Sequence, residues 1–204
     1  TREMEALDAL LWQLGLATKV PGWLITDRGS RIKFNRSFYR SYEHLPAAEL
    51  RDQTKDSLAE FILPRIQNEA VRRIRAHRRR GDRVVLMTGG LDFLMEPLRH
   101  LGDDLVAARL IEERGAFTGE LAEPPLTADG RASFAAQMAA DHGSELADCY
   151  AYGDSLSDLP LLDTVGHPYA VNADSGLTRE ARRRRWPLLE WKTEQRARVL
   201  EAAR

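Results

Sequence analysis

The chain contains three short segments whose residue types and positions suit the binding of an anion or a metal ion. The first is Thr88-Gly89-Gly90, which follows an apolar run at residues 84–87. A hydroxyl group and backbone amides at the end of a strand, just before a helix begins, are able to bind phosphate. An ordinary strand-to-helix turn has the same composition, so Thr88 and Gly89 are candidate phosphate ligands and the simpler interpretation stays open.

The second segment has two carboxylates one helical turn apart. Asp154 and Asp158 lie in the sequence Gly-Asp-Ser-Leu-Ser-Asp at residues 153–158, directly after an apolar run. Asp154 at the tip of a strand would bind a hard cation such as Mg²⁺, because such cations prefer carboxylate oxygens, and Asp158 would orient the ligand or its waters. A plain helix cap formed by Asp154 and Ser155 is the alternative. We favour the metal site because a strand, a glycine and two carboxylates coincide here.

The third segment is Gly130-Arg131, at the start of the helix that precedes this strand. A guanidinium group in that position is able to hold a phosphate or a carboxylate. Most single arginines are solvated surface residues, so Arg131 is a candidate ligand only because of its position relative to the other two segments.

Alternating strands and helices must position these residues from about residue 82 onward. Short, continuous apolar runs are typical of buried parallel strands, and the runs at helical spacing predict the helices between them. Such repeated strand-loop-helix units predict a parallel, doubly wound α/β sheet, whose ligands lie outside the carboxyl ends of the strands. The predicted strands are residues 84–87, 105–110, 149–152, 168–171 and 186–191, the helices are residues 91–101 and a segment ending at Gly143, and a hairpin is predicted over residues 111–119 with Arg114-Gly115 at its turn.

The first 80 residues have a helical pattern instead. Apolar residues recur at helical spacing in four stretches, and Pro46 is suited to open the third of them. The four stretches are residues 4–14, 32–42, 46–64 and 70–80.

The composition excludes several classes of protein. With 43% hydrophobic and 30% charged residues among 204, the chain is typical of a globular protein with one core and a small accessory element. The net charge of −1 gives no overall attraction to nucleic acid or to anionic membranes. No apolar run reaches the roughly 20 residues that cross a bilayer and no signal peptide is visible, so we expect a cytoplasmic protein without a membrane span. Cys149 is the only cysteine, which excludes an internal disulfide.

The three segments, taken in this order, resemble motifs II, III and IV of the haloacid dehalogenase superfamily, and are most similar to its phosphoserine-phosphatase-like branch, subfamily IB. Thr88 corresponds to the hydroxyl residue of motif II, Arg131 takes the place of the usual lysine of motif III, and Asp154 with Asp158 corresponds to the acidic motif IV. Residues 115–119 and 159–162 are also similar to that branch.

The resemblance implies a Rossmannoid α/β core over residues 76–204, with residues 1–75 as a helical cap. It also implies a magnesium-dependent phosphatase that cleaves phosphomonoesters through a covalent aspartyl-phosphate. Thr88, Gly89 and Arg131 would bind the substrate phosphoryl group, with Thr88 and Arg131 as catalytic residues, and Asp154 and Asp158 would form the Mg²⁺ site. The expected partner is a small phosphorylated metabolite, and no nucleic acid is expected.

The resemblance further implies a nucleophilic aspartate in an Asp-x-Asp-x-Thr segment before the cap, and the chain contains no such segment. Asp27 offers one carboxylate where this chemistry needs two. We therefore expect the nucleophile upstream of Thr1, in a longer protein. A further domain fused to that protein is compatible with this expectation. We expect the chain by itself to be inactive. Without the strand that carries this segment, two central strands would lack a partner, which is unfavourable for buried backbone groups.

Parts of the sequence are also compatible with two other functions. Residues 153–156 also resemble the start of a Gly-Asp-Ser-Leu serine esterase signature with Ser155 as nucleophile, but that family needs an Asp-x-x-His pair, whereas three residues separate Asp163 and His167. An inactive pseudophosphatase, or an appended domain that binds phosphorylated ligands, is the non-enzymatic alternative. The arginine-rich runs at residues 72–80 and 182–185 are interpreted as solvated helix faces.

Overall fold

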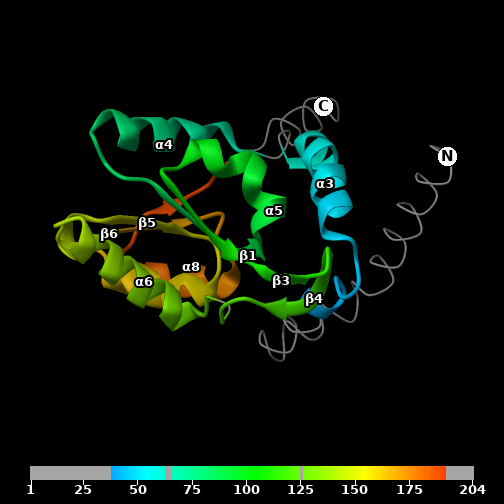
Figure 1. Ribbon diagram of the computed structural model, residues 1–204. Helices are drawn as coiled ribbons and strands as arrows, with labels where there is room; N and C mark the ends of the chain where they lie inside the picture. Colours follow the sequence, from blue (N-terminus) through cyan, green and yellow to red (C-terminus); the bar gives the residue numbers. More distant parts are fainter. Residues whose placement is uncertain (1–37, 63–65, 125, 192–204) are drawn as a thin grey trace. The chain divides into compact units, whose positions relative to one another are not determined.

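A computed structural model describes residues 38–62, 66–124 and 126–191 (Figure 1). These residues belong to two compact units, one formed by residues 38–50 and 110–122 and the other by the remaining described residues. The helices predicted before residue 38, and Asp27, lie outside the described residues. The proposed cap boundary at residue 75 stays a prediction. None of the helices in the described ranges has the length and hydrophobicity that crossing a membrane requires.

The first unit is built on the predicted hairpin, which the structure confirms. Strands β3 (Leu110–Glu113) and β4 (Ala116–Leu121) pair antiparallel. Arg114 and Gly115 form the turn with φ angles of 51° and 80°, the left-handed pair that a two-residue hairpin turn requires.

The segment before α3 (Ala47–Ile62) packs against this hairpin. Pro46 forms a bridge with Ala116, and the amide of Phe117 donates to the carbonyl of Leu45 at 3.0 Å. Phe117 is only 2% exposed and is one of the largest buried side chains among the described residues. Helix α3 begins directly after Pro46, as predicted for a proline that has no N–H to lose at a helix start.

The second unit contains the predicted parallel strands. Strand β1 (Val85–Leu91) pairs in parallel with β2 (Asp104–Ala108). Strands β5 (Tyr150–Gly153), β6 (His167–Val171) and β7 (Leu188–Leu189) form a second parallel sheet in that order. Among the described residues, β1 pairs only with β2 and β5 only with β6. The α/β class is confirmed.

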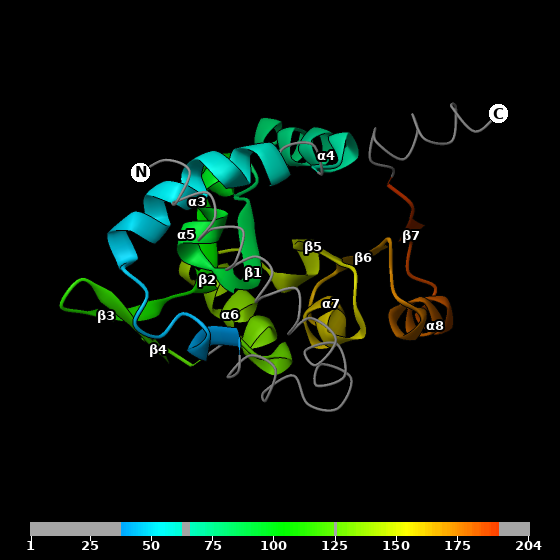
Figure 2. The same cartoon turned by 90° about the vertical axis from the view of Figure 1, so that its right-hand side faces the viewer.

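Helices cover both faces of the sheet formed by β5, β6 and β7. Figures 1 and 2 show α4 (Asn68–Arg79) on one side of β5 and β6, with α7 (Leu159–Thr164) and α8 (Ser175–Arg184) on the other. Side chains alternate between the two faces of a strand. The face toward α7 and α8 carries a small core, made of Ala151, Leu162, Ala170, Leu177 and Ala181.

The opposite face of that sheet carries aromatic side chains. A buried histidine of α4, His77, forms a hydrogen bond with one of them. His77 is 8% exposed, its Nε2 lies 2.8 Å from the Tyr152 hydroxyl, and its Nδ1 lies 2.7 Å from Oδ2 of Asp82. The Tyr152 and Tyr169 rings stack with their centroids 5.0 Å apart. Burial of the Tyr152 phenol raises its pKa to about 12. Helix α4 is thereby tied to the strand that ends at Gly153.

The prediction of one helix over residues 91–101 was wrong. Strand β1 continues to Leu91, and the chain then forms a short helix α5 (Asp92–Met95) followed by a 3-10 helix η2 (Glu96–Leu101). Pro97 explains the break, because its nitrogen has no hydrogen to donate to the carbonyl four residues earlier. The helical segment ends at Gly102, as predicted. Strand β7 is also shorter than the predicted 186–191.

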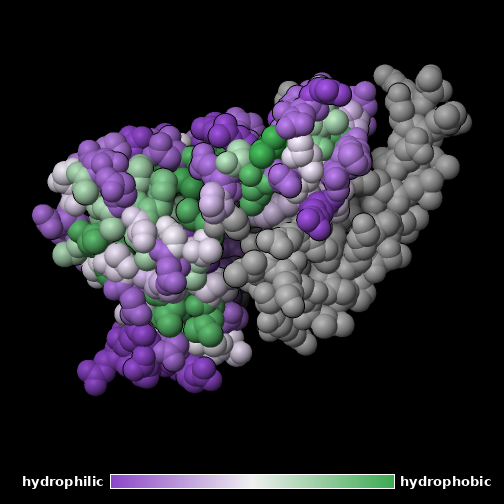
Figure 3. All heavy atoms as spheres, turned by 60° about the horizontal axis from the view of Figure 1, so that its bottom comes forward, coloured by the Kyte–Doolittle hydropathy of each residue, from purple (hydrophilic) through white to green (hydrophobic). Residues whose placement is uncertain are grey.

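The surface of the described residues is mostly hydrophilic on the face shown in Figure 3. Hydrophilic side chains cover most of it, and smaller hydrophobic areas lie among them.

Candidate active site

The loop after β5 is shaped by a close packing of Asp158 on the end of the strand. A Cβ atom at Gly153 would lie 2.7 Å from Cβ of Asp158, so only glycine leaves room for the aspartate there. After this glycine the chain forms the 3-10 helix η4 (Leu156–Asp158) and continues into α7.

Asp158 uses both of its carboxylate oxygens within the protein. Its Oδ2 accepts hydrogen bonds from the amides of Asp154 at 3.1 Å and Ser155 at 3.2 Å. Its Oδ1 lies 3.3 Å from Nη2 of Arg131, and the side chains of this ion pair are only 13% and 16% exposed. Asp158 therefore fixes the loop, and its predicted part in a metal site stays a prediction.

Arg131 reaches this loop from the first turn of α6 (Ala128–Asp141). Thr127 caps the helix by accepting a hydrogen bond from the amide of Gly130 at 3.1 Å. This cap fixes where α6 begins and therefore where Arg131 lies. Nη2 of Arg131 donates to both the carbonyl and the hydroxyl of Ser157, each at 3.0 Å. Its Nε is buried and has no acceptor among the described residues. A buried donor without an acceptor is unfavourable, so an oxygen from a bound ligand would satisfy it.

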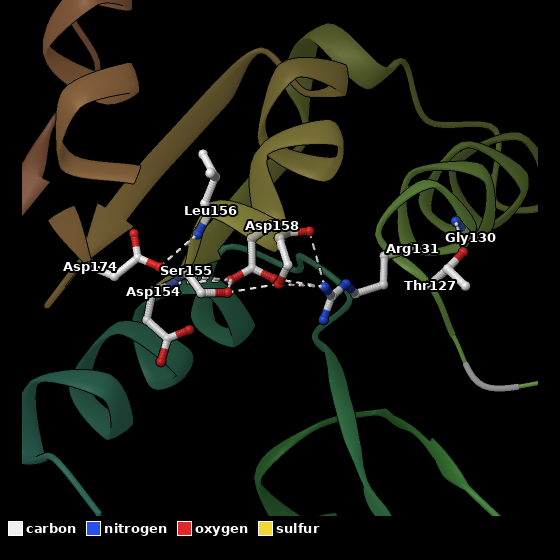
Figure 4. A network of polar contacts seen from close by, with 9 residues as sticks. Thr127, Gly130, Arg131, Asp154, Ser155, Leu156, Asp158 and Asp174 are labelled. Carbon is white, nitrogen blue, oxygen red and sulfur yellow. Dashed lines mark hydrogen bonds and ion pairs between the residues drawn. The ribbon is translucent and has the colours of Figure 1, made fainter. Parts of the chain in front are cut away.

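The Asp154 carboxylate points away from this network and carries no drawn contact in Figure 4. Its side chain is exposed, and in the described part of the chain it forms no ion pair. Desolvation by the surrounding atoms raises the pKa of Asp154, and the negative charge of Asp158 raises it further. A hard cation would compensate this concentration of negative charge, so the residues present fit one carboxylate ligand of a Mg²⁺ ion.

Asp154 does not form a complete metal site with its described neighbours. Within the described ranges, no group of three or more His, Cys, Asp or Glu side chains is arranged to hold a metal ion. A Mg²⁺ ion at this position would need further oxygen ligands.

Thr88 has a different environment from the one that the sequence predicted. Its Oγ1 accepts a hydrogen bond from the amide of Gly90 at 3.0 Å, within the extended strand β1. The amides at this position therefore belong to a strand and not to a helix N-terminus. In the part of the chain that is described, no hydrogen bond or ion pair joins Thr88 to Arg131 or Asp154. The structure thus brings Arg131, Asp154 and Asp158 together, and among the described residues it joins Thr88 to none of them by a hydrogen bond or an ion pair.

The hydroxyl of Ser155 is engaged in the loop and not with a base. Its Oγ lies 2.7 Å from Oγ of Ser157 and 3.3 Å from Oδ2 of Asp158. Among the hydrogen bonds of the described residues, none joins Ser155 to a histidine, so the geometry does not favour the serine esterase alternative.

Two residues of this network were not predicted from the sequence. Ser157 holds Arg131, and Asp174, in the turn between β6 and α8, accepts hydrogen bonds from the amides of Leu156 at 3.0 Å and Leu177 at 2.7 Å. The signal for Asp174 was an aspartate just before a helical run, which is typical of an N-cap. Nothing local in the sequence indicated its contact with Leu156.

Comparison with known proteins gives consistent results. Residues 4–163 match the haloacid dehalogenase-like hydrolases. A histidinol-phosphatase from Neisseria meningitidis is 31% identical over 192 residues, covering 82% of this chain and 86% of the relative. A probable phosphatase from Mycobacterium tuberculosis is 38% identical over 146 residues, which are 71% of this chain, and the chain spans about half (50%) of that relative's length.

Solved structures agree with the fold. A protein of unknown function from Bordetella pertussis superposes with a TM-score of 0.75 at 25% identity, covering 85% of this chain and 81% of that one. A phosphoserine phosphatase in its apo form superposes with a TM-score of 0.68 at 21% identity, covering 91% and 86%. The chain therefore belongs to the haloacid dehalogenase-like hydrolase family.

Proposed function

We propose that the full-length protein containing this chain is a phosphatase that hydrolyses a small phosphorylated metabolite with the help of Mg²⁺. The proposal depends on two neighbouring groups at the carboxyl end of β5, which are the fixed guanidinium of Arg131 and the exposed carboxylate of Asp154. Arg131 is held by Ser157 and Asp158, and the same loop presents the Asp154 carboxylate, which has no ionic partner in the described ranges. Relatives named as a histidinol-phosphatase and a probable phosphatase support the same class of reaction.

In the proposed reaction, a nucleophilic aspartate of the full-length protein attacks the phosphorus, and the bond between phosphorus and the oxygen of the substrate alcohol breaks. A second aspartate gives its proton to the leaving oxygen. The second aspartate, now a carboxylate, then takes a proton from a water molecule that attacks the phosphorus of the aspartyl-phosphate. This step breaks the bond between phosphorus and the first aspartate, releases inorganic phosphate and restores both aspartates. Bound Mg²⁺ would neutralise the charge on the phosphoryl oxygens.

The residues of this chain would position the phosphoryl group and the metal. The Nε of Arg131 has no acceptor within the part of the chain that the structure describes, so a phosphoryl oxygen would complete its hydrogen bonding. Thr88 uses a lone pair of its hydroxyl for Gly90, which leaves the hydroxyl hydrogen to donate to the substrate, beside the amide of Gly89. Asp154 would bind Mg²⁺, and Asp158 would support it as a further ligand or through the loop.

The test is the variant Asp154→Asn in the full-length protein, assayed with para-nitrophenyl phosphate over a range of Mg²⁺ concentrations. We expect turnover to fall by roughly 100-fold and the half-saturating Mg²⁺ concentration to rise, since an amide is a weaker ligand than a carboxylate. Asp163→Asn is the matched control, because this substitution removes the same charge elsewhere in the unit. Asp163 pairs with Arg184 at 2.8 Å and lies outside the proposed site. Unchanged turnover and magnesium dependence in Asp154→Asn would remove Asp154 from the mechanism.

A further inference from the structure

Asp174 connects the turn after β6 to the loop that carries Asp154. Its Oδ1 accepts from the amide of Leu177 at 2.7 Å, which caps α8, and its Oδ2 accepts from the amide of Leu156 at 3.0 Å. Its own amide donates to the carbonyl of Asp154 at 2.8 Å. Asp174 is thus hydrogen-bonded to the backbone at two positions of this loop, Asp154 and Leu156.

Two aspartates therefore hold the backbone of Asp154. Asp158 accepts from its amide, and Asp174 donates to its carbonyl, so both polar groups of this peptide backbone have partners. Figure 4 shows the loop between Asp174 on one side and Arg131 on the other. The Asp154 side chain makes none of these bonds, so its direction is set by the backbone that they fix.

The geometry of Asp174 exceeds what a helix cap needs. An N-cap requires one side-chain oxygen, which serine, threonine or asparagine supplies as well as aspartate. Asp174 uses its second oxygen for Leu156, which is 18 residues away in the chain. Only a carboxylate of this length offers two acceptors, one for each amide.

We propose that Asp174 is a positioning residue that aims the Asp154 carboxylate and thereby sets the affinity of this loop for a divalent cation. The inference rests on the proposed function, because it requires that Asp154 binds the metal. Residues that orient a metal ligand without touching the metal typically change metal affinity by roughly 10- to 100-fold when they are replaced.

The test uses Asp174→Ser in the full-length protein. Serine keeps the cap on α8 but is too short to reach Leu156 as well, so we expect a melting temperature close to that of the wild type. Hydrogen exchange at the Leu156 amide should accelerate, and the Kd for Mg²⁺, measured by calorimetry without substrate, should rise by roughly 10-fold or more. Asp174→Asn is the second variant, because its amide group offers one acceptor in place of two and so also loses one of the two bonds.

Salt and a control separate positioning from simple loss of charge. At 1 M salt the Debye length falls to about 3 Å, so an effect of charge alone would largely vanish, whereas an effect of positioning should persist. Asp163→Asn should leave Mg²⁺ affinity unchanged. A folded Asp174→Ser variant that binds Mg²⁺ as tightly as the wild type, or whose defect disappears at high salt, would overturn the inference and leave the proposed function intact. A wild-type protein that binds no Mg²⁺ would overturn both.

Discussion

The packing of Asp158 on Gly153 predicts that the variant Gly153→Ala is destabilised. The added methyl group would lie 2.7 Å from Cβ of Asp158, 3.0 Å from its Oδ2 and 3.1 Å from its Cγ. The φ angle of Gly153 is not in the positive region, so the backbone itself accepts alanine and the effect is steric. Cβ of Asp158 cannot rotate away, because it is fixed to the backbone of η4.

The magnitude follows from the two ways in which the clash is relieved. A shift of the backbone around an added methyl group costs about 1–3 kcal/mol. If Asp158 moves instead, its hydrogen bonds to the amides of Asp154 and Ser155 weaken, and hydrogen bonds to a charged group contribute about 1.5–3 kcal/mol. Together the two routes predict a loss of about 1–3 kcal/mol in the free energy of unfolding.

Denaturant unfolding of Gly153→Ala against Gly89→Ala is the appropriate assay. A Cβ at Gly89 meets nothing within 4 Å, so this control should be neutral or more stable by about 0.4–1 kcal/mol, because alanine restricts the unfolded chain. A Gly153→Ala variant with the midpoint and slope of the wild type would refute the packing of Asp158 described above.

Two further predictions concern the cores. Phe117→Ala should lower the free energy of unfolding by about 3–5 kcal/mol, since the ring is 2% exposed, and chemical denaturation measures this loss. Tyr152→Phe should cost about 1–3 kcal/mol at neutral pH, because it leaves Nε2 of the buried His77 without its hydroxyl partner. The pKa of Tyr152 is raised to about 12 from about 10 in unfolded chains, so this tyrosine stabilises the fold below pH 10 and the contribution is lost as the pH rises toward 12. Melting temperatures between pH 9 and 12 should therefore fall less steeply in Tyr152→Phe than in the wild type, and equal slopes would contradict this assignment.

The parts of the fold that the sequence predicted well depend on local signals. The turn at Arg114-Gly115 needs two left-handed residues in a row, and the start of α6 needs a capping side chain, here Thr127. Both requirements involve residues within a few positions of each other. Strand β5 and the loop after Gly153 were predicted for the same reason, from a buried run followed by a glycine.

The parts that were missed depend on contacts between distant residues. The amide of Leu156 bonds to Asp174, 18 residues later, and Arg131 bonds to Ser157, 26 residues later, so neither contact leaves a local pattern. The break at Pro97 was a local signal, but leucines at helical spacing on both sides of it favoured an uninterrupted helix. The position of Thr88 was inferred from the general rule for parallel sheets, which specifies an edge of a sheet and not a contact.

Asp158 connects the predicted metal ligand, Asp154, to the predicted phosphate ligand, Arg131. One oxygen of its carboxylate holds the backbone of Asp154, and the other faces the guanidinium of Arg131. A guanidinium has several donors, so Nη2 of Arg131 contacts Ser157 and Asp158 while Nε is left for a ligand, whereas the lysine usual at this motif has one point charge for all of these tasks. Any movement of Asp158 must therefore change the surroundings of the predicted metal ligand and the predicted phosphate ligand together. Binding of a cation at Asp154 and binding of an anion at Arg131 are, for this reason, expected to be energetically linked through a single carboxylate.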